Sequence, residues 1–301
     1  MKTSVCIATY RRPERLRALL DDLARQHLIP DEVIVVDNDP ATSALPVVEE
    51  LRNGPLPFRV VYDFQPEKNI SLTRNRTVAL AGGEWLAFID DDERAPPAWL
   101  AQLMGCVAQT RADGALGPVV PVVPPEAPAW IRRGHFYDWA RLPTGALIPP
   151  NRLRFGNVVL RASLLRGMDQ PFDPAYGLTG GEDGDLLSRL AQDGAVLRWC
   201  DEAVVHEPVE SARLSLRWLL RRSLRGGQDF ARHSLAGRYG REAASRPRLV
   251  LRALLQATAA MLLALLLLPA GRHRSFHWLA KASANLGKLS IFCGWHYREY
   301  A

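Results

Sequence analysis

The first hundred residues of this chain alternate short apolar runs with segments of helical periodicity, and this alternation constrains the fold most strongly. Short runs of apolar residues bounded by polar ones are typical of buried strands. They occur at residues 4–8 (SVCIA), 32–36 (EVIVV), 58–62 (FRVVY) and 85–89 (WLAFI). Strands that alternate with helices predict an α/β fold, in which helices cover both faces of a mostly parallel sheet.

Helix signals separate these strands. Pro13 suits the first turn of a helix. One apolar helical face follows it, at Leu16, Leu19, Leu20 and Leu23. Ser71 is expected to cap another helix that runs to Ala81 and ends at Gly82-Gly83. Each helix is therefore long enough to return the chain to the start of the next parallel strand.

Residues 117–151 interrupt this alternation. The segment contains eight prolines and four aromatic residues, Trp130, Phe136, Tyr137 and Trp139, and is a poor candidate for a helix or central strand. Two interpretations stay open: a packed irregular connection, or an acceptor-binding loop, since long loops in compact domains often carry function. The regular pattern then resumes with a strand at 156–160, a helix from Gly180-Gly181 to about Asp193, and a short strand at 203–205 that ends at His206.

Polar residues stand where the predicted strands end. Thr9 follows the first strand, Asp37 the second, and the run from Asp90 to Asp92 the fourth. Ligands bind at the carboxyl ends of strands in open parallel sheets. Adjacent carboxylates repel one another unless a cation or hydrogen-bond donor neutralises them, and hard oxygen ligands suit Mg²⁺ or Mn²⁺.

The charge of the chain is divided unevenly. Residues 211–301 carry 16 Lys and Arg but 3 Asp and Glu, whereas residues 1–210 have a net charge of −7. We therefore expect an acidic catalytic domain at 1–210 and a basic helical tail at 211–301. The tail contains residues 253–268, of which 14 are apolar, between an arginine-rich stretch and Arg272–Arg274.

This tail predicts a helix that lies in or dips into a membrane. The apolar stretch is short for a spanning helix, which needs roughly 20 residues, and a buried helix packed on the catalytic domain is the alternative. Because the arginines run directly into apolar sequence, lipid is favoured over nucleic acid as the anionic partner. We expect no nucleic-acid partner.

Composition excludes several classes of protein. With 48% hydrophobic and 23% charged residues, the chain is neither collagenous nor wholly disordered. Its four cysteines are far apart and form no CxxC pair, so a structural zinc site has no support and a reducing compartment is expected. The N-terminal sequence lacks the apolar region of a signal peptide.

Several motifs together resemble those of family 2 glycosyltransferases with the GT-A fold. They are SVCIATYRRP at 4–13, VVDND at 35–39, SLTRN at 71–75, FIDDDE at 88–93, GGEDGDL at 180–186 and VVHEPV at 204–209. The motifs occur in the order of that family and cover about residues 1–210. The stretch from Gly180 to Arg222 resembles bacterial exopolysaccharide enzymes of the succinoglycan type. The resemblance implies a Rossmann-like GT-A domain followed by the membrane-associating tail.

The resemblance implies a nucleotide-sugar donor, with a UDP-sugar favoured. Thr9 and Tyr10 would then contact the base or ribose, and Asp37 or Asn38 the edge of the base. The family often has an aspartate where this chain has Asn38, and an amide donates as well as accepts hydrogen bonds. Three further residues belong to this predicted binding group: Arg12, Asp91 and Arg74, which would reach the diphosphate unless it is a solvated helix residue.

By the same resemblance, Asp92 would be the main ligand of Mn²⁺ or Mg²⁺. Asp90 would bind ribose or a metal-bound water, and His206 would supply a further ligand unless it is structural. Asp183, beside Glu182, would be the catalytic base that takes the proton of the acceptor hydroxyl; the alternative is that both acids merely complement a helix dipole. The reaction would be one displacement with inversion at the anomeric carbon.

The sequence thus predicts a metal-dependent inverting transferase at the cytoplasmic face of the inner membrane, held peripherally or by its C-terminal region. Its acceptor would be a saccharide or a lipid-linked oligosaccharide in exopolysaccharide or cell-surface synthesis. A sugar-phosphate nucleotidyltransferase is one alternative, but the first strand is followed by ATYRRP and not by a glycine-rich loop. A non-catalytic saccharide or nucleotide binder is the other, and the presence of every expected carboxylate opposes it.

Overall fold

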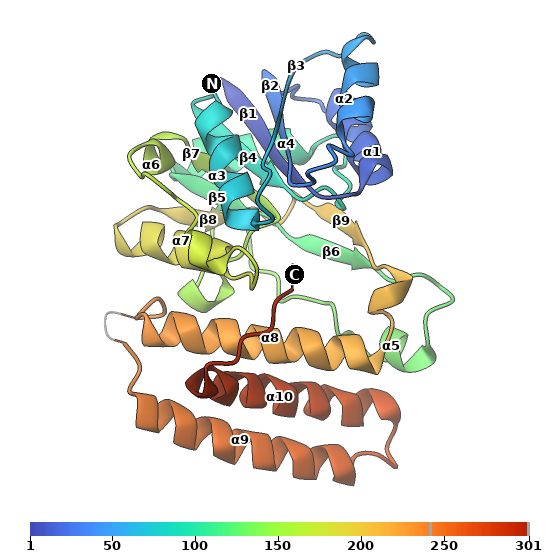
Figure 1. The fold of residues 1–301 in the computed structure, drawn as a ribbon, viewed down its shortest axis with the longest axis vertical. Coiled ribbons are helices and arrows are strands. Elements are labelled where there is room, and N and C mark those ends of the chain that lie inside the picture. Colours follow the sequence, from blue (N-terminus) through green and yellow to red (C-terminus); the bar gives the residue numbers. More distant parts are fainter. Residues whose placement is uncertain (241–242, 300–301) are drawn as a thin grey trace. The chain divides into compact units, whose positions relative to one another are not determined.

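The computed structural model describes residues 1–240 and 243–299 and divides into two compact units (Figure 1). The first unit comprises residues 1–120 and 139–207, and the second comprises residues 121–138 and 208–299. We name them the catalytic unit and the helical unit. The sequence analysis predicted the division near residue 210. In the structure, the proline-rich residues 121–138 also belong to the second unit, together with the helices that follow residue 208.

A seven-stranded sheet forms the centre of the catalytic unit, in the order β3-β2-β1-β4-β7-β5-β8. Strands β1 to β4 run parallel, as do β5 and β8, while β7 is antiparallel to both of its neighbours. The prediction of a mostly parallel sheet is therefore confirmed. The strands are β1 (Thr3–Thr9), β2 (Glu32–Asp37), β3 (Arg59–Phe64), β4 (Trp85–Ile89), β5 (Gly114–Leu116), β7 (Asn157–Arg161) and β8 (Leu197–Trp199).

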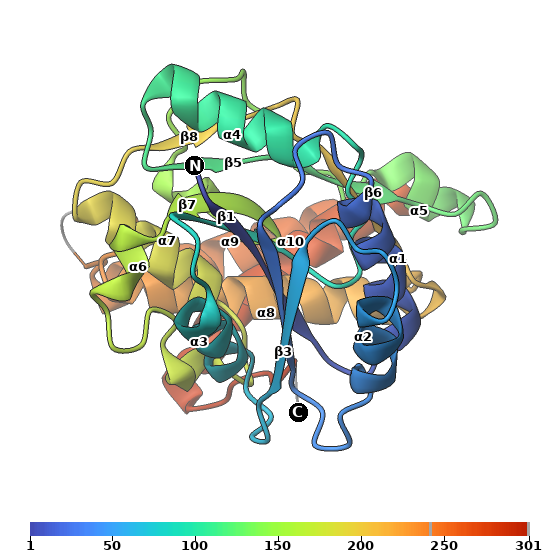
Figure 2. The same cartoon turned by 90° about the horizontal axis from the view of Figure 1, so that it is seen from above.

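Helices cover both faces of this sheet (Figure 2). One face packs against α1 (Pro13–Ala24), α2 (Leu45–Arg52) and α4 (Trp99–Thr110). The other packs against α3 (Ile70–Leu80), α6 (Ser163–Arg166) and α7 (Glu182–Gln192). Side chains alternate between the faces, as the strand period of two requires: Val5 and Ile7 of β1 join the first core, and Cys6 joins the second.

Local details differ from the sequence expectations. Helix α3 is capped by Asn69, whose Oδ1 accepts a hydrogen bond from Leu72 N, and not by Ser71. An asparagine at that position satisfies the same free N–H group. The last predicted strand lies at β9 (Val205–Pro208) and pairs with β6 (Val119–Val122) outside the main sheet. Sequence periodicity missed β5 and β8 because three residues are too few to show alternation.

The helical unit contains α5 (Ala129–Gly134), α8 (Leu216–Leu235), α9 (Arg246–Leu266) and α10 (Arg272–Ser290). Helix α10 packs along both α8 and α9, and α5 also packs on α10. Two glycines allow α8 and α10 to approach closely: a Cβ on Gly227 would lie 1.8 Å from Ala284 O, and one on Gly287 would lie 2.0 Å from Leu224 O. Four short 3₁₀ turns complete the described elements, at Pro150–Arg152, Pro174–Tyr176, Ser211–Arg213 and Ile291–Cys293.

Aromatic side chains of the proline-rich segment pack inside the helical unit. Trp130 lies edge-on to Phe276 of α10, with ring centroids 4.9 Å apart, and also meets Phe136. Tyr137 donates a hydrogen bond to Arg213 O at 2.8 Å and lies against Trp218. These contacts favour the packed-connection interpretation for residues 121–138. Trp139 differs, because it is 59% exposed and the Arg154 guanidinium lies 4.1 Å above its ring.

Candidate active site

The carboxyl ends of β1 and β4 meet in a group of paired charges. Thr9 Oγ1 donates a hydrogen bond to Asp91 Oδ2 at 2.8 Å. Arg12, at the start of α1, contacts Asp91 and Asp92 at 3.0 Å each, and Arg15 lies 3.7 Å from Asp92. The two aspartates are buried. These side chains lie close together because β1 and β4 are parallel neighbours in the sheet, so the residues that follow the two strands lie at the same edge.

Arg74 of α3 joins this edge to α7. Its guanidinium contacts Asp90 at 3.0 Å and Glu182 at 2.5 Å. The same group lies over the rings of Phe155 and Phe172, at 5.1 and 5.9 Å from their centroids. Arg74 is thus buried, so it is not the solvated helix residue of the alternative interpretation. Its observed partners are protein carboxylates, and contact with a diphosphate stays a prediction.

Asp183 reaches the same site from the first turn of α7. Its carboxylate lies close enough to Asp90 to raise the pKa of that group. Asp183 Oδ2 accepts a hydrogen bond from Phe155 N at 3.2 Å. The helix begins after Gly180 and Gly181, which have φ values of +78° and +99°, a backbone conformation that glycine adopts without strain. Residues some ninety positions apart in the sequence therefore share one acidic site.

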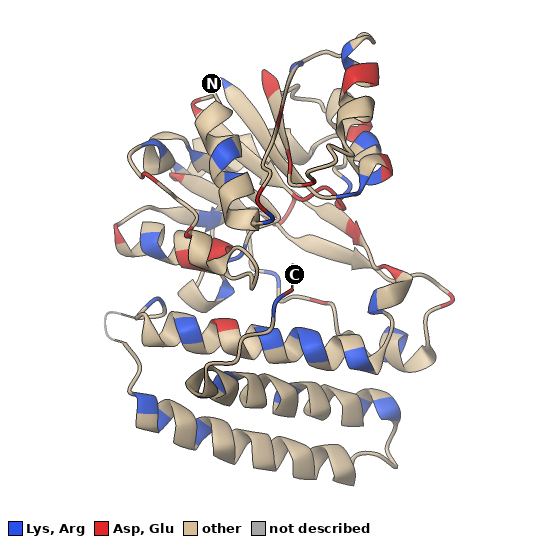
Figure 3. Ribbon diagram, viewed as in Figure 1, with Lys and Arg blue, Asp and Glu red and all other residues tan. Residues whose placement is uncertain are grey.

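Negative charge accumulates in this site (Figure 3). Burial and the nearby Asp92 and Asp183 charges raise the pKa of Asp90, although Arg74 opposes the shift. Burial, together with Asp92, also raises the pKa of Asp91 to about 6, against the influence of Arg12 and Thr9. Such shifts mean that loss of water and the neighbouring negative charges together disfavour the ionised carboxylates. Binding a cation would relieve this repulsion.

Carboxylate oxygens are the ligands that Mn²⁺ and Mg²⁺ prefer. The chemistry of Asp90 and Asp92 fits such an ion, and so does the surplus of negative charge around Asp90. Within residues 1–240 and 243–299, no group of three or more His, Cys, Asp or Glu side chains has the arrangement of a complete metal site. Any ion held here would therefore take its remaining ligands from outside the chain or from a small rearrangement.

Glu93 is a buried member of the site that the sequence analysis quoted but gave no role. Its Oε2 accepts a hydrogen bond from Asp90 N at 3.1 Å. Burial and the charges of Asp90, Asp92 and Glu207 raise its pKa well above the ordinary value. A Cβ on Gly156 would lie 2.8 Å from Glu93 Oε1, so this glycine leaves room for the glutamate. Its position directly after three aspartates was the available sequence signal.

The side chains at the end of β2 organise loops. Asp37 accepts hydrogen bonds from Asp39 N at 2.9 Å and Ala44 N at 2.8 Å, and burial raises its pKa. Asn38 Nδ2 donates to Gln65 O and Glu67 O at 2.9 and 2.6 Å, and its Oδ1 accepts from Asn69 N. These observed partners are backbone groups. Recognition of a base by either side chain stays a prediction.

Two cationic side chains lie near the ring of Tyr10, which follows β1. Its ring is partly buried, with the Arg11 guanidinium 5.0 Å and the Lys68 ammonium 4.8 Å from the centroid. Arg11 also contacts Asp39 at 3.2 Å. An aromatic ring with nearby positive charge offers both a stacking surface and phosphate-binding groups. This chemistry suits the nucleotide contact predicted for Tyr10.

His206, the predicted further metal ligand, lies in β9 and is paired with Arg94. His206 lines a cavity of about 230 Å³ together with Asp22, Arg25 and Arg94. Its backbone pairs with Arg94 in an antiparallel bridge, and it is the next residue, Glu207, whose charge reaches Glu93. Successive side chains of a strand point to opposite sides. The expectation that His206 joins Asp90 and Asp92 as a metal ligand therefore finds no support in this geometry.

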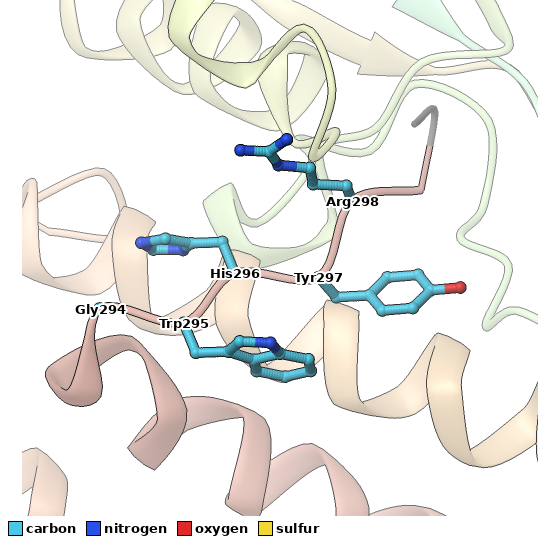
Figure 4. A pocket seen from close by; sticks show the side chains of 5 residues that line it. All are labelled: Gly294, Trp295, His296, Tyr297 and Arg298. Atoms are coloured by element: carbon cyan, nitrogen blue, oxygen red, sulfur yellow. The ribbon is translucent and has the colours of Figure 1, made fainter.

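A second cavity, of about 470 Å³, lies within the helical unit and is lined by residues 294–298 (Figure 4). Gln228 of α8 holds this segment: its Nε2 donates to Trp295 O at 3.0 Å, and its Oε1 accepts from Tyr297 N at 2.9 Å. Side chains of Trp295 and Tyr297 thereby point away from those of His296 and Arg298. The lining combines aromatic rings with the guanidinium of Arg298.

Comparisons with known proteins identify the family of this chain. Residues 4–169 match the family model described as Glycosyl transferase family 2. The succinoglycan biosynthesis protein ExoM of Rhizobium meliloti (strain 1021) is 38% identical over 233 residues, covering 75% of this chain and 73% of that protein. Galactofuranosyltransferase GlfT1 of Mycobacterium tuberculosis (strain ATCC 25618 / H37Rv) is 29% identical over 228 residues, covering 68% of this chain and 69% of that protein.

Solved structures of S. aureus TarS share the fold. TarS 1-349 in complex with UDP-GlcNAc has a TM-score of 0.57 and 18% identity, covering 99% of this chain and 93% of that chain. The UDP complex of the same fragment has a TM-score of 0.56 and 20% identity, with the same coverage. The chain spans 55% of a longer TarS structure. At this level of identity the likeness shows the fold alone.

Proposed function

Because the chain belongs to glycosyl transferase family 2 and is a glycosyltransferase, we propose that it transfers a sugar from a nucleotide-sugar donor to a saccharide acceptor. The acceptor is a growing exopolysaccharide or cell-surface saccharide carried on a lipid. The succinoglycan role of ExoM supports the polymer class, and the UDP and UDP-GlcNAc complexes of TarS support a UDP-sugar. The reaction takes place at the cytoplasmic face of the membrane.

One observation carries this proposal: Arg74 contacts both Asp90, at the end of β4, and Glu182, the first residue of α7 and the neighbour of Asp183. The donor binds beside Thr9, Tyr10 and the strand-end aspartates. Asp183 lies at the start of α7, where two glycines leave space for a sugar to approach the backbone. A donor sugar held at this edge therefore lies within reach of a carboxylate from a different element.

Asp183 is the base in this proposal. It accepts the proton of the acceptor hydroxyl while that oxygen attacks the anomeric carbon of the donor sugar and the bond to the diphosphate breaks. A single displacement of this kind inverts the configuration of that carbon. A positioned base contributes on the order of 10²–10⁴ in rate. Glu182, paired with Arg74, holds the first turn of α7 against the end of β4.

Asp90 and Asp92 hold Mn²⁺ or Mg²⁺ in this proposal. When bound, the cation offsets the negative charge that develops on the departing nucleoside diphosphate. Arg12 and Arg15 contact Asp92 and Arg74 contacts Asp90, so these arginines orient the carboxylates. Their positive charge also lies where a diphosphate would need stabilisation.

A donor screen tests the proposed function. Thermal melting is measured with UDP-, GDP- and dTDP-sugars, with Mn²⁺ and with EDTA, and sugar transfer is then measured for the best binder. We expect a UDP-sugar to raise Tm in the presence of Mn²⁺ and a stereochemical analysis of the product to show inversion. Asp92→Ala should lose this shift while the exposed control Asp169→Ala keeps it. Normal turnover of Asp92→Ala, or in EDTA, contradicts the metal assignment.

A further inference from the structure

Helix α9 is apolar on two opposite sides. Its buried side faces α10 and is made of small residues and one leucine: Leu249, Ala253, Ala260 and Ala264. The opposite side is exposed and is lined by Leu251, Leu254, Leu255, Met261, Leu262, Leu265 and Leu266. These positions follow the helical repeat, interrupted once at Thr258, and so lie along one side of the helix. We name this set the leucine stripe.

The large apolar side chains of the leucine stripe are strongly exposed to solvent. Leu255 is 64% exposed, Leu265 63% and Leu266 73%. Among the residues that the structure describes, α9 is the one helix that is long and apolar enough to cross a membrane, with a mean hydropathy of 2.0 and 22% of that window buried. Large contiguous apolar patches on a protein surface mark a binding partner.

Positive charge brackets this stripe. Helices α9 and α10 contain no Asp or Glu, and their basic residues are Arg246, Arg248, Arg252, Arg272, Arg274, Lys281 and Lys288. Figure 3 shows basic residues in the first turns of α9 and none along the rest of it. The surface therefore combines an apolar strip with cationic ends, which complements acyl chains beneath anionic headgroups. A second copy would bring like charges together at both ends.

Packing within the helical unit decides how α9 meets the lipid. Helix α9 is about 31 Å long, which matches the hydrocarbon thickness of about 30 Å. Helix α10, however, packs along it after a short turn, and Ser275 Oγ donates to Ala264 O at 2.8 Å. If α9 spanned the bilayer, the exposed Lys281 of α10 would lie within the hydrocarbon, where an unpaired cation is unfavourable.

We propose that α9 is a monotopic anchor: it lies parallel to an anionic bilayer, with the leucine stripe in the interface and its flanking arginines against lipid phosphates. Helices α8 and α10 stay on the aqueous side. This inference rests on the membrane location included in the proposed function, and it names the anchor and its orientation. Membrane binding is measured separately from sugar transfer, so that either proposal can fail alone.

Vesicle flotation of the full chain tests the anchor. Vesicles of phosphatidylcholine that contain the anionic lipid phosphatidylglycerol are compared with vesicles of phosphatidylcholine alone. We expect at least tenfold more protein with the anionic vesicles, and at least a tenfold loss for Leu255→Ser/Leu262→Ser. Leu28→Ser/Leu147→Ser removes two exposed leucines of the catalytic unit and should bind as the parent does. Equal binding by the stripe variant overturns the proposal.

A second measurement distinguishes a helix α9 that lies parallel to the membrane surface from one that spans the bilayer. In a Cys293→Ser background, whose remaining cysteines are buried, a fluorophore is attached to a cysteine at position 251, 258 or 265. A helix parallel to the surface gives equal, shallow quenching by spin-labelled lipid at all three positions. Deep quenching confined to position 258 indicates a spanning helix and overturns the proposal. Light scattering completes the test, because a dimer that the stripe variant dissociates, without vesicle binding, would identify a second copy as the partner.

Discussion

The two units of this protein differ in where they place charged and apolar side chains. The catalytic unit buries apolar side chains on both faces of its sheet and gathers carboxylates at the carboxyl ends of β1 and β4. The helical unit leaves the leucine stripe exposed and has a strong excess of arginine. The comparison teaches that the first unit is arranged to enclose a polar ligand, while the second is arranged to present a surface.

This contrast predicts that substitutions at the acidic site change sugar transfer or the stability of the catalytic unit, whereas substitutions in the helical unit leave the acidic site intact. The largest effect is expected for Asp183→Asn. Sugar transfer should fall by about 10²–10⁴, the contribution of a positioned base, while donor binding by thermal shift persists. Asp193→Asn, at the exposed end of the same helix, should transfer sugar at the parental rate. Similar rates of sugar transfer for the two variants would contradict the assignment of Asp183 as the catalytic base.

The Arg74–Glu182 pair should show the second largest effect. Both side chains are buried, and removal of one partner from a buried pair costs about 3–5 kcal/mol. We expect Glu182→Gln and Arg74→Met each to lower the free energy of unfolding by about 3 kcal/mol. The double variant should lose less than the sum of the two, since Met fits beside Phe155 and Phe172. Additive losses in urea titrations would mean that the pair is not coupled.

In the helical unit, two adjacent glycines of α8 give a matched test of packing. Gly227→Ala would place a Cβ 1.8 Å from Ala284 O, so α8 and α10 must separate. Overpacking of this kind costs about 1–3 kcal/mol. A Cβ on Gly226 meets nothing within 4 Å, and Gly226→Ala should stabilise α8 by about 0.5–1 kcal/mol. The free energy of unfolding of each variant is measured by chemical denaturation followed by circular dichroism. A change of the same sign for both variants would contradict the close α8–α10 contact at Gly227.

The smallest effect concerns Asp22, a charge of the catalytic unit outside the acidic site. Although burial opposes ionisation, hydrogen bonds from Arg94, Arg25 and Ala95 lower the pKa of Asp22 below its ordinary value of 3.8. A lowered pKa stabilises the fold above pH 3.8 and this contribution is lost as the pH falls through the folded-state value. Because Arg94 is about half exposed, we expect about 1 kcal/mol at neutral pH.

Unfolding of Asp22→Asn measured between pH 3 and pH 7 checks this expectation, over a range chosen around the ordinary carboxyl pKa of about 3.9. The difference from the parent protein should be present near neutral pH and shrink at the acidic end. Asp193→Asn serves as the control, since that side chain is exposed. A difference that stays constant with pH would show that the charge of Asp22 contributes nothing to stability.

Much of the fold was predictable because it depends on local pattern. Pro13 opens α1, and the four apolar runs became β1 to β4 with boundaries shifted by a few residues. The basic tail formed long helices, as its composition indicated. The short strands β5 and β8 and the pairing of β9 with β6 were missed, because three or four residues carry too little periodicity and pairing depends on distant partners.

The sequence by itself determined the class of fold, the family and the residue types near the strand ends. The reason is that strand and helix periodicity and the family motifs depend only on the order of residues in the chain. Tertiary structure alone decided which side chains meet. It brought the start of α7 to the end of β4, gave Arg74 two carboxylate partners, engaged Asn38 with loop backbone and placed His206 at a cavity that Asp22 and Arg94 also line. The physical reason is that such contacts depend on the direction in which each segment leaves the sheet, which long-range packing sets.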